Sequence, residues 1–330
     1  MKFLFVILRL FSPEVAHSIS LNGLKLIHQL GLIRIIASKD IRSSDQYRLN
    51  ELVFKNRLGI AAGLDKNGDF IDSLGALGFG FIEVGTITPL AQEGNPKPRI
   101  FRLFKENAVI NRLGFNNKGV DYLVRKLKQK KYQGVVGVNI GANKDSKNEK
   151  RINDYLICFE KVADYADYIT INISSPNTPE LTNLHNQDNI KVLIQSIEEK
   201  SKFLNFSGPI FLKISPDESI SLIEDIAQII ENSLLTGLIV SNTTINKKNL
   251  NDKKYTSFEG GLSGMPLMEE STKRLKKIKE KFPLLPIIGV GGVMSKSDFD
   301  TKILSGASLV QIYTGFTIRG PLIIKEILGK

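Results

Sequence analysis

The loop Asn172–Thr178 carries the residue types best suited to act on a small polar ligand. It follows the apolar run Tyr168–Ile171, so it begins where a buried strand is expected to reach the surface. Pro176 and Pro179 restrict the backbone around its amides and hydroxyls. Such a loop can hold a planar polar ligand and offer a hydroxyl oxygen to a proton. A simple turn uses the same residue types, so the loop alone leaves both interpretations open.

Every apolar run of the chain ends in a polar or glycine-rich cluster. The clusters are Ala61–Gly68, Gly85–Pro89, Asn139 with Gly141, the loop at Asn172, Lys213, Ser241–Thr244, Gly289–Gly292 and Tyr313–Gly315. Glycine, amides, hydroxyls and two lysines dominate this set, and the paired carboxylates of glycosidases are missing from it. These groups suit hydrogen bonds to a flat heterocycle and to a phosphate.

The glycines near the end of the chain predict the phosphate site. Gly289–Gly292 and Tyr313–Gly315 end the seventh and eighth apolar runs, and Gly260–Gly264 precedes them. In a barrel, the turns after strands seven and eight commonly form a phosphate cradle. Each glycine turn alone says little, but together they predict a phosphate-bearing ligand.

Eight short apolar runs alternate with helical segments and would position these clusters. The runs are Leu58–Ala62, Phe81–Thr86, Val135–Ile140, Tyr168–Ile173, Ile210–Ile214, Leu238–Ser241, Ile287–Val290 and Leu309–Tyr313. Their nearly continuous Val- and Ile-rich character is typical of parallel strands covered on both faces. They predict an α/β fold, a (β/α)8 TIM barrel over residues 41–330, with the clusters around one mouth. A doubly wound open sheet is the alternative.

Two segments fall outside the regular alternation. Arg99–Phe104 and Val109–Phe115 flank the polar turn Lys105–Ala108, which predicts an inserted β-hairpin near 99–115. Inserted loops at the carboxyl ends of barrel strands build active sites.

Residues 1–40 predict an N-terminal amphipathic helical hairpin. Ser12-Pro13-Glu14 is typical of a helix start, and apolar residues from Ala16 to Ile33 recur at helical spacing with a break near Gly31. So much apolar surface must pack against the body of the protein, a partner or a membrane face.

Composition excludes several classes of site. Cys158 is the only cysteine, which excludes an intrachain disulfide and a CxxC-type metal site. His17, His28 and His185 are scattered, so we expect neither a metal site nor a Ser-His-Asp triad. No apolar run approaches the ~20 residues that cross a bilayer, and Phe3–Leu8 is short for a signal peptide. The net charge of +11 favours anionic partners, but lysine-rich helices hold much of it, so charge does not select a function.

Six separated motifs resemble the dihydroorotate dehydrogenases. They are Gly63–Lys66, Asn111–Asn117, Asn172–Thr178, Ser241–Thr244, Gly260–Gly264 and Val290–Gly292. The resemblance runs from the N-terminal hairpin to the last residues. The serine at 175 and the N-terminal extension are similar to class 2, the membrane-associated, quinone-reducing branch. Class 1 has a cysteine at the matching position and lacks the extension.

The resemblance implies that FMN is the cofactor and that dihydroorotate is oxidised to orotate in de novo pyrimidine biosynthesis. By similarity, the residues around the flavin are Ala62, Gly63, Thr86, Asn139, Asn172, Lys213, Ser241, Gly264, Gly292, Tyr313 and Thr314. The residues that would hold dihydroorotate are Lys66, Asn111, Gly114, Phe115, Asn172, Asn177, Asn242 and Thr243. Ser175 would remove the proton from C5 and pass it on through water or Thr178.

The residue types agree with these roles. Dihydroorotate is a cyclic ureide with a carboxylate, and asparagine amides match its alternating N–H and C=O groups. Lys66 would supply positive charge near the carboxylate. A cation at Lys213 would stabilise the anionic reduced flavin.

The same resemblance implies that ubiquinone or menaquinone reoxidises the flavin. Residues 1–40 would form the quinone tunnel and dock on the bilayer, helped by the basic charge. His17, Arg102 and Tyr313 match positions near the quinone head in relatives. We therefore expect a peripheral, monomeric protein at the cytoplasmic face of the cell membrane, with no nucleic acid partner.

Two other functions compete with this interpretation. An FMN-dependent tRNA dihydrouridine synthase shares the barrel and the cofactor, and the charge would suit RNA. Such enzymes use a cysteine acid and a C-terminal RNA-binding domain, whereas Cys158 lies in the helix-like stretch Asp154–Val162 and the chain ends soon after strand eight. A barrel that only binds at a membrane surface would show gaps in the polar ring, and none is present.

Overall fold

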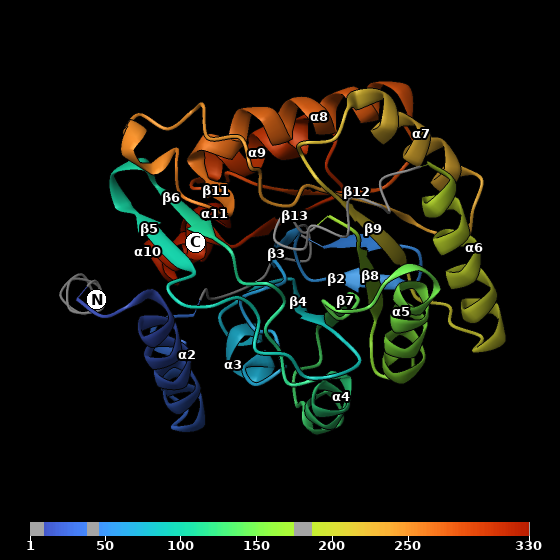
Figure 1. Ribbon diagram of the computed structural model, residues 1–330. Coiled ribbons are helices and arrows are strands. Elements are labelled where there is room, and N and C mark those ends of the chain that lie inside the picture. Colours follow the sequence, from blue (N-terminus) through green and yellow to red (C-terminus); the bar gives the residue numbers. More distant parts are fainter. Residues whose placement is uncertain (1–9, 38–45, 175–186, 330) are drawn as a thin grey trace.

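Eight parallel strands close into a barrel in the order β10–β12–β13–β3–β4–β7–β8–β9 (Figure 1). The computed structural model describes residues 10–37, 46–174 and 187–329. The barrel strands are β3 (Leu58–Ile60), β4 (Phe81–Ile87), β7 (Val135–Ile140), β8 (Tyr168–Asn172), β9 (Ile210–Ile214), β10 (Gly237–Val240), β12 (Ile287–Val290) and β13 (Leu309–Ile312). β13 pairs with β3, so the predicted (β/α)8 barrel is confirmed and the open sheet is wrong.

Helices follow the strands and form an outer ring around the barrel (Figure 1). They are α3 (Ile71–Gly75), α4 (Val120–Gln129), α5 (Asn148–Val162), α6 (Gln187–Phe203), α7 (Ile220–Glu231), α8 (Met268–Lys281), α9 (Lys296–Leu304), α10 (Thr314–Arg319) and α11 (Leu322–Ile327). In α7, Ile223, Ile226, Ala227 and Ile230 are buried, which is the spacing of one helix face. The helices pack on the barrel through such buried faces. The ends of the strands are not covered by this packing and are available to bind a ligand.

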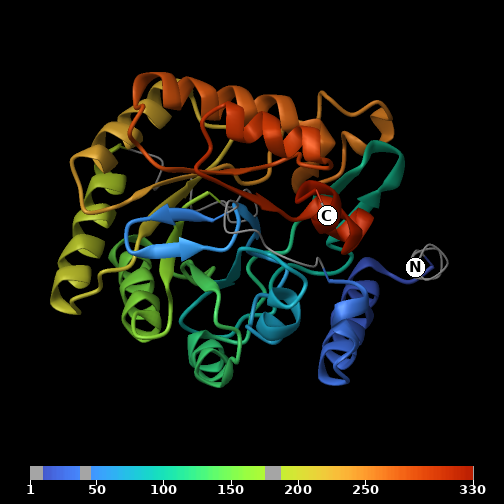
Figure 2. The same ribbon diagram turned by 180° about the vertical axis from the view of Figure 1, so that it is seen from behind.

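A short β-hairpin closes the amino-terminal end of the barrel (Figure 2). It consists of β1 (Tyr47–Leu49) and β2 (Leu52–Phe54). The Phe54 ring meets the Phe81 ring edge-on at 5.3 Å between centroids, and Tyr168 and Phe211 continue this aromatic packing across the interior. The packed floor directs ligand binding to the opposite, carboxyl-terminal mouth. The sequence analysis did not predict this hairpin.

A three-stranded antiparallel sheet stands beside that mouth. β5 (Ile100–Leu103) and β6 (Ala108–Asn111) pair antiparallel and are joined by the 3₁₀ turn η3 (Phe104–Glu106), within the segment 99–115. β11 (Gly261–Gly264) pairs with β6 and places Gly261 opposite Asn111. The glycine-rich stretch predicted only as part of a phosphate cradle is therefore also a strand. Two further 3₁₀ turns, η5 (Lys253–Tyr255) and η6 (Met265–Leu267), flank it.

The described N-terminal segment consists of helix α2 (Pro13–Gln29) and the 3₁₀ turn η1 (Leu32–Ile35). α2 begins at Pro13 as predicted and lies beside α3 outside the ring (Figure 1). Ala16, Leu21 and Leu24 form its buried side. Its other side and its flanks expose large apolar residues, namely Leu10, Phe11, Val15, Ile19, Leu26, Leu30, Leu32 and Ile35. Among the described helices, none combines the length and the apolar character that crossing a bilayer would require.

Candidate active site

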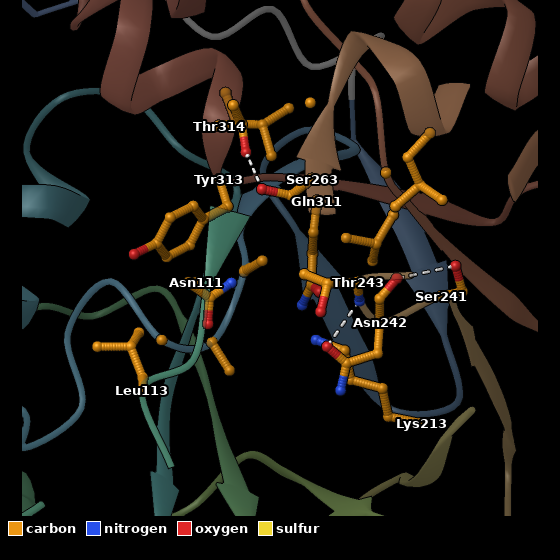
Figure 3. Close-up of a pocket in the computed structure, with 18 of the residues that line it drawn as sticks. Asn111, Leu113, Lys213, Ser241, Asn242, Thr243, Ser263, Gln311, Tyr313 and Thr314 are labelled. Atoms are coloured by element: carbon orange, nitrogen blue, oxygen red, sulfur yellow. Dashed lines mark hydrogen bonds between the residues drawn. The ribbon is translucent and has the colours of Figure 1, made fainter. Parts of the chain in front are cut away.

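A cavity opens at the carboxyl ends of the barrel strands (Figure 3). Ten of the eleven predicted flavin residues line it, namely Ala62, Gly63, Thr86, Asn172, Lys213, Ser241, Gly264, Gly292, Tyr313 and Thr314. The predicted substrate residues that line it are Lys66, Asn111, Gly114, Phe115, Asn172, Asn242 and Thr243. Tyr313 and Leu113 stand on one side of the cavity, and Lys213, Ser241 and Asn242 stand on the other (Figure 3).

Of the predicted residues that the structure describes, Asn139, Arg102 and His17 do not line this cavity. Asn139 is fully buried one layer below it. Ser175 and Asn177 lie outside the described residues. Arg102 lies on the inserted sheet, where its guanidinium donates to the Phe11 carbonyl and covers the Phe104 ring.

His17, the remaining predicted quinone residue, lines a second cavity beneath α2. Lys66, Leu113 and Tyr313 line both cavities, so they form the partition between them. Burial and the nearby charge of Lys66 lower the pKa of His17 to about 4, which leaves its imidazole neutral at pH 7. Burial raises the pKa of Tyr313 to about 12, so its hydroxyl keeps its proton. The second cavity therefore contains the neutral imidazole of His17, and the partition combines the neutral Tyr313 hydroxyl with the ammonium of Lys66.

The buried carboxylate of Glu83 organises the floor of the first cavity. It accepts hydrogen bonds from Asn139 Nδ2 at 2.8 Å, Tyr168 Oη at 2.9 Å, Thr170 Oγ1 at 3.2 Å and Gln311 Nε2 at 2.8 Å. The donors come from three other strands of the barrel. A buried carboxylate needs this many partners, because an unpaired charge inside a protein is costly. The contacts tie four strands together directly under the cavity.

The hydrogen bonds continue upward from Asn139 to the cavity wall. Its Oδ1 accepts from Thr86 Oγ1 at 2.6 Å and from Asn172 Nδ2 at 3.2 Å. Asn172 Oδ1 in turn accepts from the backbone N–H and the hydroxyl of Ser174, each at 3.2 Å. Asn242 Nδ2 also donates to the Ser174 hydroxyl, at 3.1 Å. The amide directions at the mouth are thus set by a continuous network that begins at Glu83.

Two lysines present positive charge to the cavity. Neither Lys66 nor Lys213 has a hydrogen-bond or ion-pair partner among the described residues. Burial lowers the pKa of Lys213, and the charge of Glu83 opposes that shift. Burial and the charge of Arg99 lower the pKa of Lys66 to about 8, against the opposite influence of Glu14 and Asp65. Two such cations call for a ligand with anionic or electron-rich atoms.

The glycine turn after β12 forms a cradle of backbone donors. Gly291 and Gly292 have φ values of +111° and +85°, which favour glycine. A Cβ added to Gly292 would lie 2.3 Å from Met268 Cα, so the start of α8 leaves no room for a side chain. The backbone N–H groups of Gly291, Gly292 and Val293 have no acceptor among the described residues. Unpaired donors at a strand end suit a phosphate.

Two polar residues of the site were not predicted from the sequence. Gln311 is fully buried, lines the cavity and has no partner for its Oε1 atom among the described residues. Ser263 lies 2.8 Å from Thr314 across the cavity rim, measured between their hydroxyl oxygens (Figure 3). A signal for Gln311 was present, since it is a lone polar residue inside the apolar run Leu309–Tyr313.

Comparison with known proteins identifies close relatives of the chain. A family model described as dihydroorotate dehydrogenase matches residues 46–330. A curated dihydroorotate dehydrogenase (quinone) of Saccharophagus degradans is 45% identical, over 95% of this chain and 93% of that protein. A curated dihydroorotate dehydrogenase (quinone) of Neisseria meningitidis is 43% identical, over 98% of this chain and 96% of that protein. The chain also resembles a solved structure, the crystal structure of DHODH from Eimeria tenella in complex with ferulenol, with a TM-score of 0.87. The two sequences are 33% identical, and the match covers 96% of this chain and 90% of that chain.

Proposed function

The chain belongs to the dihydroorotate dehydrogenase family, and from this premise we propose that the cavity at the carboxyl ends of the barrel strands is where dihydroorotate is oxidised. The protein is an oxidoreductase that oxidises dihydroorotate to orotate in pyrimidine biosynthesis, and a quinone accepts the electrons. The observation that carries the proposal is that Lys66 and Lys213 line one cavity at the carboxyl ends of the strands and that neither has a hydrogen-bond or ion-pair partner among the described residues.

The flavin of this enzyme is FMN, held between the glycine cradle and Lys213. The donor set fits the group: within the described part of the chain, the backbone N–H groups of Gly291 and Gly292 have no acceptor, and the buried Gln311 Oε1 has no donor. Gly264 and Thr314 complete the phosphate end. When bound, FMN supplies a ring that accepts a hydride from the substrate and passes the electrons on. The ammonium of Lys213 then favours negative charge on that ring.

Dihydroorotate binds against the opposite wall. Its ring offers N–H and C=O groups that the amides of Asn111, Asn172 and Asn242 can match. Asn242 and Asn172 are pre-oriented by Ser174, so they lose little conformational entropy on binding. The ammonium of Lys66 pairs with the substrate carboxylate. The family resemblance assigns four more residues to substrate binding, namely Asn177, Gly114, Phe115 and Thr243.

Ser175 removes the proton from C5 of the substrate. It directly follows Ser174, which the amides of Asn172 and Asn242 hold at the cavity. A serine hydroxyl is a weak base, so it must pass its proton onward, through water or Thr178, as the reaction proceeds.

The quinone reaches the flavin through the second cavity. Tyr313 lies in the partition, His17 is uncharged, and Arg102 lies on the neighbouring sheet. The exposed apolar side of α2 docks on the cytoplasmic face of the cell membrane, and the net charge of +11 favours anionic lipid. The protein acts as a peripheral monomer with ubiquinone or menaquinone and without nucleic acid.

The two competing functions are not favoured. Cys158, the only cysteine available as the acid of a dihydrouridine synthase, is buried in α5 and does not line the cavity. A barrel that had lost its chemistry would lack the polar wall, and the described wall is continuous from Glu83 to Asn242.

Anaerobic mixing with dihydroorotate tests the function. The purified protein should show a flavin spectrum that dihydroorotate bleaches, and a quinone added afterwards should restore it. A colourless protein would contradict the assignment of a flavin. A flavin that dihydroorotate leaves oxidised would contradict the substrate, and a reduced flavin that quinones leave reduced would contradict the acceptor.

A further inference from the structure

Lys302 is a fully buried lysine that the reaction described above does not use. It lies in the last turn of α9, and it is 0% exposed. Helices α8 and α9 lie side by side (Figure 1), and the ammonium points across to α8. There it donates to the hydroxyl of Ser271 at 2.6 Å.

Nothing in the described chain balances this charge directly. Lys302 forms no ion pair among the described residues. The carboxylate on its own helix whose charge acts on it, Asp298, accepts hydrogen bonds from the Met294 N–H and the Ser295 hydroxyl at the start of α9. A buried ammonium whose described partner is a neutral hydroxyl is costly unless an anion lies nearby. Burial lowers the pKa of Lys302 to about 7 despite the opposing charge of Asp298.

Ser271 connects this cation to the glycine cradle. Its hydroxyl oxygen lies 3.1 Å from the Gly291 carbonyl oxygen and is itself fully buried. It also lies 2.8 Å from the Leu267 carbonyl and 3.2 Å from that of Met268. Because Lys302 donates to the Ser271 oxygen, the hydroxyl hydrogen remains for these carbonyls.

The direction of the Gly291 carbonyl determines the direction of the Gly292 N–H, because the two groups belong to one peptide unit. The peptide between Gly291 and Gly292 is trans, so its C=O and its N–H point in opposite directions. Its oxygen is turned toward Ser271, and its N–H, on Gly292, is therefore turned away from α8. That N–H has no acceptor among the described residues, and Gly292 lines the cavity.

We propose that Lys302 and Ser271 form a buried support behind the glycine cradle that aims the Gly292 N–H and supplies positive charge for the phosphate of the bound flavin nucleotide. This inference rests on the proposed binding of FMN. Lys302 is a positioning residue that acts through Ser271. It explains why a lysine is buried here, since a phosphate dianion on the other side of the Gly291–Gly292 turn balances its charge.

The test compares two flavins that differ only in the phosphate. Full-length protein is loaded with FMN or with riboflavin, and the dissociation constant of each is measured from the fluorescence of released flavin. Lys302→Met removes the charge at similar length, and Ser271→Ala removes the link to Gly291. Lys279→Met is the control, because Lys279 is a half-buried lysine on the neighbouring helix α8 that donates to the Leu285 carbonyl at 2.8 Å and not to Ser271.

Both variants should lose FMN affinity, Lys302→Met by about tenfold or more, with riboflavin affinity unchanged. The control should keep the wild-type ratio of the two constants. Equal losses for both flavins would mean that Lys302 only maintains the fold, and wild-type affinity for both flavins would mean that the cradle does not need it. Either result overturns the inference. If Lys302→Met does not fold, the ratio in Ser271→Ala decides in the same way. Wild-type protein that binds neither flavin would instead overturn the proposed function.

Discussion

Asn139 Nδ2 lies 2.8 Å from Glu83 Oε1, and this contact turns the amide oxygen of Asn139 toward the cavity. Since that oxygen accepts from Thr86 and Asn172, a carboxylate inside the barrel sets the donor directions at the site above it. A glutamine at 83 would bring one acceptor oxygen and two new donors where four donors now converge.

Glu83→Gln should therefore lower the free energy of unfolding by about 3 kcal/mol, because a buried donor loses its partner. Denaturant unfolding of the purified variant measures this loss. Glu93→Gln is the control, since Glu93 is exposed and its side chain should contribute little. Equal stability of the two variants would contradict the structural role of Glu83.

Lys66 should give the reaction a falling limb at alkaline pH. Its pKa in the enzyme without substrate is about 8, so the ammonium that pairs with the substrate carboxylate is present below pH 8 and is lost above it. We expect kcat/KM for dihydroorotate to decline as the pH rises through about 8. Lys66→Met should raise KM about thirtyfold, equivalent to ~2 kcal/mol, and should remove that limb. The exposed Lys296 provides the control variant Lys296→Met, whose pH profile should match the wild type.

Ser175→Ala should retain flavin but slow its reduction by dihydroorotate by about 10²–10⁴-fold, the usual contribution of a positioned base. Stopped-flow absorbance under anaerobic conditions measures the rate. Dithionite should reduce the variant and the wild type equally fast, which shows that the flavin itself is intact. Reduction by dihydroorotate at the wild-type rate would refute the base assignment.

Gly292→Ala should reduce flavin content on purification. The new methyl group would meet the backbone of Met268 at 2.3 Å, and relief of this overlap must distort the cradle or α8 at a cost of about 1–3 kcal/mol. Gly23→Ala is the matched control, because a Cβ there meets nothing within 4 Å in the middle of α2. That control should be neutral or slightly stabilising. Full flavin content in Gly292→Ala would show that the turn adapts without loss of the cradle.

The exposed side of α2 should control access of long-tailed quinones. Ile19 and Leu26 are 45% and 56% exposed and lie two helical turns apart, so Ile19→Asp with Leu26→Asp places two charges on this side. The double variant should lose binding to anionic vesicles and turnover with long-tailed quinones, while dihydroorotate still reduces its flavin. Leu304→Asp, at an exposed apolar position of α9, should change neither. Normal vesicle binding by the double variant would contradict docking through α2.

The amino-acid sequence by itself determined the barrel and most of the cavity wall. Eight apolar runs have the length and composition of buried parallel strands, and each run ends in residues able to bind a ligand. Because a closed parallel barrel brings all carboxyl ends to one mouth, residues as distant as Gly63 and Thr314 could be assigned to one site without coordinates.

Only the tertiary structure decided which groups meet behind that wall. Glu83 and Gln311 lie in otherwise largely apolar strands, Lys302 lies in a mostly polar helix, and nothing nearby in the chain identifies their partners. Asn111 and Gly261 are 150 residues apart, yet their strands pair to form the rim. Hydrogen bonds and charge pairs depend on distances of a few ångströms between separate strands and helices. The spacing of residues along the chain determines which face of a helix or strand each side chain occupies. The distances between side chains on separate elements are set only when the barrel closes and the helices pack around it.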